Sequence, residues 1–278
     1  MSIEMKAKAD TSYGWGETAK IVVQALAIAM VVRVFFYQPF NIPSGSMKDT
    51  LLVGDFLFVS KLSYGYSKYS FPRHVTLCLP FTDMCGTFRI LPDLISGGRV
   101  LSSEPERGDV VVFKLPRDNS TDYIKRVIGL PGDRIQVKNG VLHINGTAVP
   151  KRKEGVVVIS CFDGTRPRPV DWFVETLPNG VTHRTLDCQS NGSFDNTAEF
   201  TVPEGHYFMM GDNRDNSIDS REAKERGGVG FVPAENLIGR AEIIFFSCAS
   251  DEPGRCSWFQ PWMWPFDIRW SRIFGLVR

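Results

Sequence analysis

The sequence has few of the residues on which metal sites and nucleic-acid-binding surfaces are built. It contains only four histidines, and its six cysteines form no C-x-x-C motif, so the spacing of the cysteines does not indicate a zinc site. Its 32 basic and 31 acidic residues give a formal net charge of +1, with no excess that would attract nucleic acid. We therefore expect no metal, no cofactor and no nucleic-acid partner.

The composition is that of an ordinary folding chain. The 278 residues are 43% hydrophobic and 23% charged, which is enough for one domain or for one domain with an insertion. The cysteines are grouped along the chain as Cys78/Cys85, Cys161/Cys188 and Cys248/Cys256. Local disulfides are expected if this part faces an oxidising compartment, and buried reduced thiols are the alternative.

The most apolar segment is the uncharged run Ile21–Val32, which only Gln24 interrupts. If Arg33 snorkels, the span 19–38 reaches the roughly 20 residues that a bilayer requires. Bulky aromatic residues follow the run where a signal peptide would have a small-residue cleavage site. We expect a retained transmembrane anchor, and a buried core helix is the alternative.

Lysines before the anchor indicate its orientation. Lys6, Lys8 and Lys20 precede the apolar run. Because basic residues favour the cytoplasmic side, we expect a cytoplasmic tail at 1–18 and everything after the anchor on the other side.

Beyond the anchor, short β-branched runs bounded by Gly, Pro or Asp predict a mainly β protein. We expect strands at 109–115, 123–128 and 241–246. Turn dipeptides follow one another at Asn139-Gly140, Asn145-Gly146, Asp163-Gly164, Asn179-Gly180 and Asn191-Gly192. They predict an inserted β-hairpin subdomain at 138–202, within a core formed by 39–137 and 203–278.

Two stretches are rich in aromatic residues. One is Phe71–Ile95, and the other is the C-terminal WFQPWMWPFDIRWSRIFGLVR, which mixes tryptophans with basic residues. Such mixtures suit the headgroup region, so we expect both to face the membrane. The alternative for the C-terminal stretch is packing over the β core.

The loop that follows the anchor contains a serine in an unusual setting. Pro43 fixes the entering backbone and Gly45 allows a close turn, so Ser46 could be held exposed with its N–H and hydroxyl pointing the same way. Serines in such loops are commonly turn residues, and that reading stays open.

A nucleophilic serine needs a base, and no histidine lies in a recognisable triad context. In the predicted strand YIKRVI, Arg126 stays protonated in proteins, but Lys125 could lose its proton. Apolar neighbours that lowered a lysine pKa from about 10.4 to about 7 to 8 would correspond to roughly 3 to 5 kcal/mol of desolvation. The alternative is a lysine whose stem packs on the sheet and whose ammonium group reaches water.

The loop Met210–Arg221 combines Asp, Asn and Ser residues with two arginines, which predicts side chains that bond one another and the backbone. A calcium loop is excluded by spacing. Counting from Asp212, arginine stands at the third position, Ser217 replaces the glycine and Ala223 replaces the closing glutamate.

Together these segments resemble bacterial type I signal peptidases, the membrane-bound serine proteases that remove signal peptides. The resemblance follows the order of the chain: the anchor, IPSGSM, GDFLFVSK, RGDVVVF with YIKRVIGLPGD, then GDNRDNSIDSR with GFVP and GRA. It covers the anchor junction and the catalytic core, but not the insertion or either tail. It implies a signal-peptidase-type β-sheet core.

The resemblance also implies roles for individual residues. Ser46 matches the nucleophile, Lys125 the general base and later general acid, and Ser217 the hydroxyl that orients the lysine. Ser44 matches an oxyanion-hole hydroxyl beside the N–H of Ser46. The residues expected to brace the site are Asp212, Asp219 and Arg221. The residues expected to line shallow pockets for small P1 and P3 side chains are Phe40, Ile42, Pro43, Met47, Leu51, Tyr123 and Ile124.

By the same resemblance, the chain is expected in a bacterial inner membrane with its catalytic domain on the periplasmic or outer side. Exported preproteins cleaved after Ala-x-Ala sites are the implied substrates, and the secretion translocon is a possible neighbour. After Met47 the family pattern has one residue and then proline, whereas here Lys48 is followed by Asp49. A self-cleaving serine-lysine regulator and a non-catalytic anchored envelope domain are the alternatives.

Overall fold

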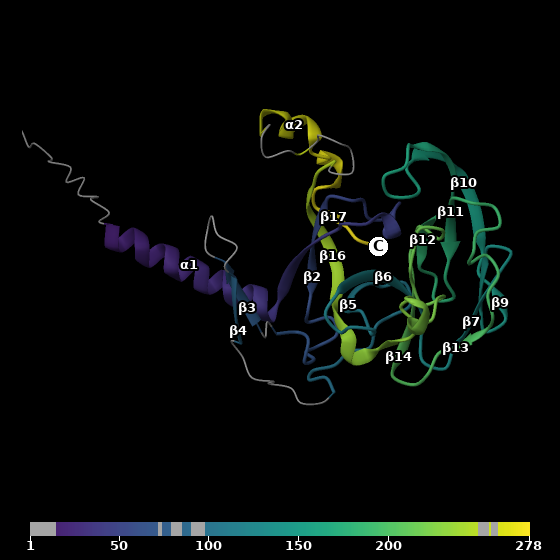
Figure 1. Cartoon of the computed structure of the whole chain (residues 1–278), viewed down its shortest axis with the longest axis horizontal. Helices are drawn as coiled ribbons and strands as arrows, with labels where there is room; N and C mark the ends of the chain where they lie inside the picture. Colours follow the sequence, from purple (N-terminus) through teal and green to yellow (C-terminus); the bar gives the residue numbers. More distant parts are fainter. Residues whose placement is uncertain (1–14, 72–73, 79–84, 90–97, 250–255, 257–260) are drawn as a thin grey trace, which may run out of the picture.

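The structure is a computed structural model that describes residues 15–71, 74–78, 85–89, 98–249, 256 and 261–278. Within these residues it is mainly β, as the sequence predicts, and it begins with one long helix (Figure 1). The residues 1–14, including Lys6 and Lys8, lie outside the described part.

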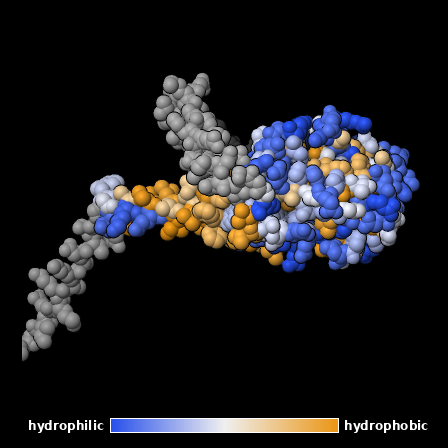
Figure 2. All heavy atoms as spheres, turned by 90° about the horizontal axis from the view of Figure 1, so that it is seen from below, coloured by the Kyte–Doolittle hydropathy of each residue, from blue (hydrophilic) through white to orange (hydrophobic). Residues whose placement is uncertain are grey.

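Helix α1 (Trp15–Phe35) has 21 residues, none of them buried. At about 1.5 Å per residue it is about 30 Å long, which matches the hydrocarbon thickness of a bilayer. It is long and apolar enough to cross a membrane, and its exposure removes the alternative of a buried core helix. Figure 2 shows hydrophobic residues along α1 and where it joins the domain.

The helix ends earlier than the expected anchor. Tyr37 and Gln38 lie in strand β1 (Tyr37–Asn41), because they pair with Ser60 and Val59 of strand β2 (Asp55–Ser60). Sheet pairing therefore takes the last two residues of the expected span. The amine of Lys61 donates to the carbonyl of Val34 at 3.3 Å, and this contact attaches the C-terminal end of α1 to the domain.

The main sheet is antiparallel and has the order β1-β2-β16-β5-β6-β14-β15, with β17 paired to β16. Its remaining strands are β5 (Val110–Lys114), β6 (Asp122–Gly129), β14 (His206–Met210), β15 (Val232–Pro233), β16 (Leu237–Ser247) and β17 (Gly275–Leu276). The strands expected at 109–115, 123–128 and 241–246 are confirmed as β5, β6 and part of β16.

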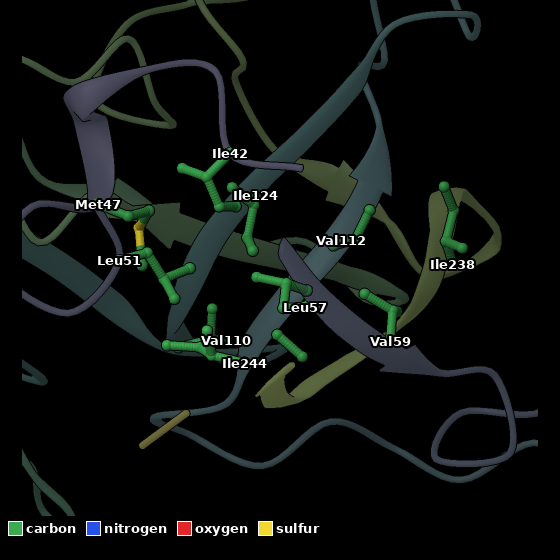
Figure 3. Packing of buried hydrophobic residues seen from close by; sticks show 11 residues of the cluster. Ile42, Met47, Leu51, Leu57, Val59, Val110, Val112, Ile124, Ile238 and Ile244 are labelled. Atoms are coloured by element: carbon green, nitrogen blue, oxygen red, sulfur yellow. The ribbon is translucent and has the colours of Figure 1, made fainter. Parts of the chain in front are cut away.

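Both faces of the main sheet are covered, which explains the uninterrupted apolar run of β5. Val110 and Val112 pack in one core cluster, and Val111 and Phe113 in another. The first cluster also holds Ile42 and Met47, so the loop that carries Ser46 rests directly on the core (Figure 3).

The strands between Arg134 and Thr201 form two small sheets, which lie at the end of the molecule away from α1 in Figure 1. One contains β7 (Arg134–Lys138), β8 (Val141–Ile144), β9 (Thr147–Ala148) and β13 (Phe200–Thr201). The other contains β10 (Lys151–Ile159), β11 (Arg168–Thr176) and β12 (Thr182–Asp187). Because β7 pairs with β8 and β13, the inserted sheet begins at Arg134, shortly before the expected boundary.

Two of the expected turns are tight hairpins with left-handed backbone. Asn139 and Gly140 join β7 to β8 with φ of 49° and 71°, and Asn145 and Gly146 join β8 to β9 with φ of 53° and 81°. Asparagine and glycine adopt these angles most readily, so the turn chemistry fixes the register of this sheet.

The remaining elements are short. They are η1 (Gly45–Met47), β3 (His74–Cys78), β4 (Cys85–Arg89), η2 (Lys224–Arg226), η3 (Ala234–Asn236), η4 (Pro261–Met263), α2 (Trp264–Asp267) and η5 (Trp270–Arg272). Strands β3 and β4 form a hairpin, while the rest of the stretch 72–97 lies outside the described residues.

Two of the three expected cysteine pairs are disulfides, Cys161–Cys188 and Cys248–Cys256. Cys78 lies opposite Cys85 in the β3–β4 register, and the side chains of both lie outside the described part. The pairing within each local group is therefore confirmed for two groups.

Candidate active site

The loop that carries Ser46 is the short helix η1, between β1 and β2. Ser44 enters it in extended backbone, and the side chain of Met47, its last residue, is fully buried. Leu51 N donates to Met47 O at 2.8 Å, and Ile42 N donates to Asp55 O at 2.9 Å. The loop is thus fixed on both sides. Ser46 is only 7% exposed, so it is less exposed than the sequence suggested, and it lies at the wall of a cleft.

Lys125, on β6, is the hydrogen-bond partner of Ser46. Its Nζ lies 2.7 Å from Ser46 Oγ and 2.9 Å from the carbonyl oxygen of Ile124. The side chain is 3% exposed. Burial lowers the pKa of Lys125 to about 8, with a further lowering from Arg221, against the opposing charges of Asp219 and Asp212. A substantial neutral fraction near pH 7 to 8 follows.

Beside this pair, the loop 210–221 forms buried ion pairs, as its composition predicts. Arg126, next to Lys125, donates to both carboxylate oxygens of Asp212 at 2.8 and 2.6 Å. Arg221 donates to both oxygens of Asp219 at 2.9 and 2.8 Å. Burial alone would raise the pKa of both aspartates, but the partner guanidinium outweighs it and holds each pKa below its ordinary value. Both carboxylates stay charged.

Gly211 is where this loop meets the serine loop. A Cβ there would lie 2.2 Å from Ser217 Oγ and 2.5 Å from Ser46 O. The backbones approach so closely that only glycine fits. Gly211 N donates to Asp219 Oδ2 at 3.0 Å, which ties the two ends of the loop together.

Ser217 and Ser44 both line the cleft beside Ser46. Ser217 is buried, and its Oγ meets no hydrogen-bond criterion among the described residues, so it does not bond Lys125 in this structure. Its hydroxyl lies near Asp219 and helps to hold the pKa of that carboxyl below its ordinary value. Ser44 is half-buried, and its side chain makes no capping hydrogen bond to η1. Its hydroxyl is therefore not used in the helix cap.

The cleft has a volume of about 660 Å³ and joins an apolar part to the Ser46–Lys125 pair. Five of the expected pocket residues line it, namely Phe40, Ile42, Pro43, Tyr123 and Ile124. Met47 and Leu51 do not. They are fully buried in the core beneath, so the structure corrects their expected place in the pocket.

The family model described as signal peptidase, peptidase S26, matches residues 15–246. The chain belongs to this family. It is 40% identical over 268 residues to signal peptidase I of Rickettsia typhi (strain ATCC VR-144 / Wilmington), covering 90% of this chain and 89% of the relative.

Other relatives carry the same name. Signal peptidase I of Rickettsia akari (strain Hartford) is 42% identical over 228 residues, which are 80% of this chain and 76% of the relative. A crystal structure of a signal peptidase I from Enterococcus faecalis V583 is 28% identical, with a TM-score of 0.29, over 50% of this chain and 97% of that chain.

Three residues of the site were not found from the sequence. Asn213 donates its side-chain amide to Gly45 O at 3.2 Å and its backbone N–H to Ser46 O at 3.1 Å. Asp163 and Lys48 also reach the serine loop. Lys48 itself gave no signal in the sequence, because the departure from the family pattern is at Asp49, where proline is expected. From the sequence, Asp163 was interpreted only as part of the turn Asp163-Gly164.

Proposed function

We propose that this chain is a membrane-anchored serine endopeptidase that removes signal peptides from exported preproteins with Ser46 as nucleophile and Lys125 as general base. Membership of the signal peptidase family supports the activity. The observation that carries the chemistry is the 2.7 Å contact between Lys125 Nζ and Ser46 Oγ. Because burial lowers the pKa of Lys125 to about 8, its amine can accept a proton near neutral pH.

In the first step, neutral Lys125 takes the Ser46 proton as Oγ attacks the carbonyl carbon of the scissile bond. The developing oxyanion accepts hydrogen bonds from the backbone N–H of Ser46 and the hydroxyl of Ser44. The Lys125 ammonium then protonates the leaving amine of the mature protein, which departs. The signal peptide remains as an ester on Ser46.

In the second step, Lys125 takes a proton from a water molecule, which attacks the ester and releases the signal peptide as a carboxylic acid. Ser46 recovers its proton from Lys125. We assign to Ser217 the role of orienting the amine once substrate excludes water from the cleft, and its buried hydroxyl, which has no hydrogen-bond partner among the described residues, supports this role. Asp212, Asp219 and Arg221 hold the surrounding backbone.

The apolar part of the cleft supports a preference for small side chains. Phe40, Ile42, Tyr123 and Ile124 line it, while Ile42 and Ile124 themselves rest on the core. Because packed core leaves little room below them, the pockets are shallow and suit alanine. We infer cleavage after Ala-x-Ala at the P3 and P1 positions.

The exposed apolar surface supports a membrane location. Tyr37, Phe56 and Phe58, on β1 and β2, are each more than a third exposed. Near the C-terminus, Trp262, Phe266, Trp270 and Phe274 are 67%, 77%, 63% and 79% exposed. Exposed aromatic rings favour the headgroup region, so the domain would rest on the bilayer that α1 crosses.

We infer a bacterial inner membrane, with the N-terminus cytoplasmic and the catalytic domain on the periplasmic or outer side, near the secretion translocon. Disulfides at Cys161–Cys188 and Cys248–Cys256 suit an oxidising compartment. The predicted membrane contact of 71–95 falls largely outside the described residues.

The test is incubation of the purified protein, in detergent, with a preprotein that carries an Ala-x-Ala site, followed by N-terminal sequencing of the product. We expect one new N-terminus directly after the second alanine, and none with Ser46→Ala or Lys125→Met. Absence of cleavage by the unmodified protein would favour the non-catalytic envelope domain. Cleavage of its own chain, with the preprotein left intact, would favour the self-cleaving regulator.

A further inference from the structure

The tip of the β10–β11 hairpin, residues 160–166, lies against the loop that carries Ser46. Asp163 Oδ2 accepts a hydrogen bond from Gly45 N at 3.2 Å. From the other side, Lys48 Nζ donates to Ser160 O at 3.1 Å and lies 3.7 Å from Asp163 Oδ1. The inserted subdomain thus contacts the residues on both sides of the serine.

The fit at this contact is tight. A Cβ on Gly45 would lie 2.7 Å from Asp163 Oδ1 and 2.9 Å from Lys48 Cε. The Lys48 side chain is 2% exposed and that of Asp163 is 52% exposed. A lysine is rarely so buried without a charged partner and hydrogen bonds. Lys48 therefore holds the hairpin tip to the loop and balances the Asp163 charge.

A second set of contacts fastens the same tip. Asn213 Nδ2 donates to Cys161 O at 2.8 Å and to Gly45 O at 3.2 Å. The disulfide Cys161–Cys188 then joins the tip to the end of β12. One amide side chain therefore links the hairpin tip, the serine loop and the loop 210–221.

We propose that Asp163 is a positioning residue for the serine loop, carried there by a hairpin that the Cys161–Cys188 disulfide holds in place. This rests on the proposed function. The carboxylate accepts from the N–H of Gly45 and so fixes the peptide plane between Ser44 and Gly45. That plane lies next to the Ser44 side chain, and Asn213 fixes the following plane, which holds the Ser46 N–H, by donating to Gly45 O at 3.2 Å. The two contacts together position the Ser44 hydroxyl and the Ser46 N–H, the two donors assigned to the oxyanion.

The role needs a positive charge beside Asp163. A carboxylate beside a developing oxyanion opposes its charge, unless a cation compensates. Lys48 supplies that cation from the buried side of the same contact. The Lys48–Asp163 ion pair therefore joins two segments that are far apart in the sequence.

The test compares Asp163→Ala and Asp163→Asn with unmodified protein in the preprotein assay, with kcat and KM determined separately. Asp163→Ala should lower kcat by about tenfold or more, because small displacements of reacting groups have effects of this size. KM should change less than twofold. Asp163→Asn keeps an acceptor for Gly45 N–H and should recover most of kcat.

Asp171→Ala is the matched control, since it breaks an exposed ion pair with Lys153 in the same subdomain, away from the serine loop. It should leave kcat unchanged. The melting temperature of Asp163→Ala should stay within about 2 °C of the unmodified protein, because a half-exposed ion pair contributes little to stability. A kcat within twofold of normal for Asp163→Ala would overturn the role, as would an equal loss in Asp171→Ala.

A second comparison tests the disulfide. The double variant Cys161→Ser/Cys188→Ser should lose kcat as Asp163→Ala does, whereas Cys248→Ser/Cys256→Ser should not. An unchanged kcat in Cys161→Ser/Cys188→Ser would overturn the role of this disulfide. Ser46→Ala is assayed alongside. An unmodified protein that is inactive would refute the proposed function, whereas an active one with unaffected Asp163→Ala would refute the positioning role alone.

Discussion

Replacement of Lys125 by methionine should abolish activity and, at neutral pH, stabilise the fold. Methionine has a similar length and no charge. Burial lowers the Lys125 pKa from 10.5 to about 8, so the native state accepts the proton less readily than the unfolded chain does. With about 1.4 kcal/mol per pKa unit, the difference corresponds to about 3 kcal/mol of destabilisation below pH 8.

The sign follows from proton binding. Between pH 8 and 10.5 the unfolded chain holds more protons at this site, so the stability of the unmodified protein rises with pH across that window. Below pH 8 the buried lysine destabilises the fold by the full amount, and above pH 10.5 it does not destabilise the fold. Methionine removes the dependence. It also removes hydrogen bonds to Ser46 and Ile124, a loss of about 1 kcal/mol.

The net expectation at pH 7 is a gain of about 2 kcal/mol, or roughly 4 to 8 °C in melting temperature for a domain of this size. The measurement is thermal unfolding of both proteins in detergent at pH 7 and at pH 10.5. The gain should shrink to nothing or reverse at the higher pH. A Lys125→Met protein that is less stable at pH 7, or a gain that is the same at both pH values, would refute the reasoning.

Three further substitutions test how the site is held. Asp212→Asn leaves Arg126, which is fully buried, without its charged partner, and should lower the free energy of unfolding by about 3 to 5 kcal/mol in denaturant titrations. Smaller losses would mean that water or another group replaces the carboxylate. Gly211→Ala places a Cβ 2.5 Å from Ser46 O and should lower both the melting temperature and kcat, and normal kcat would contradict this close approach. Ser217→Ala removes a buried hydroxyl with no partner, so stability should change by less than about 1 kcal/mol, while kcat should fall at least tenfold if the hydroxyl orients Lys125. An unchanged kcat would remove that role.

Features set by neighbouring residues were predictable. The apolar run predicted α1, and the Asn-Gly dipeptides predicted the turns on either side of β8. The helix end was misplaced because Tyr37 and Gln38 can continue an apolar helix, and only their pairing with β2 decides otherwise. Sheet pairing joins segments far apart in sequence, and local patterns do not contain that information.

In the candidate site, too, residue types were predictable from the sequence, whereas contacts between distant segments were not. Ser46 and Lys125 were chosen by residue chemistry and by resemblance, although their contact spans 79 positions. Met47 and Leu51 were assigned to the pocket by resemblance to the family, but their side chains point into the core. Asp163 lies 118 positions from Gly45, in a hairpin that the resemblance does not cover. Its contact depends on how the inserted sheets pack, which the turn pattern alone does not determine.

The central claim is that one buried amine is the base for Ser46, and the pH dependence of kcat/KM for preprotein cleavage tests it most directly. With the Lys125 pKa lowered to about 8, log kcat/KM should rise by about one per pH unit up to pH 8 and then level off. A rate that is constant from pH 5.5 to pH 9 would contradict the account.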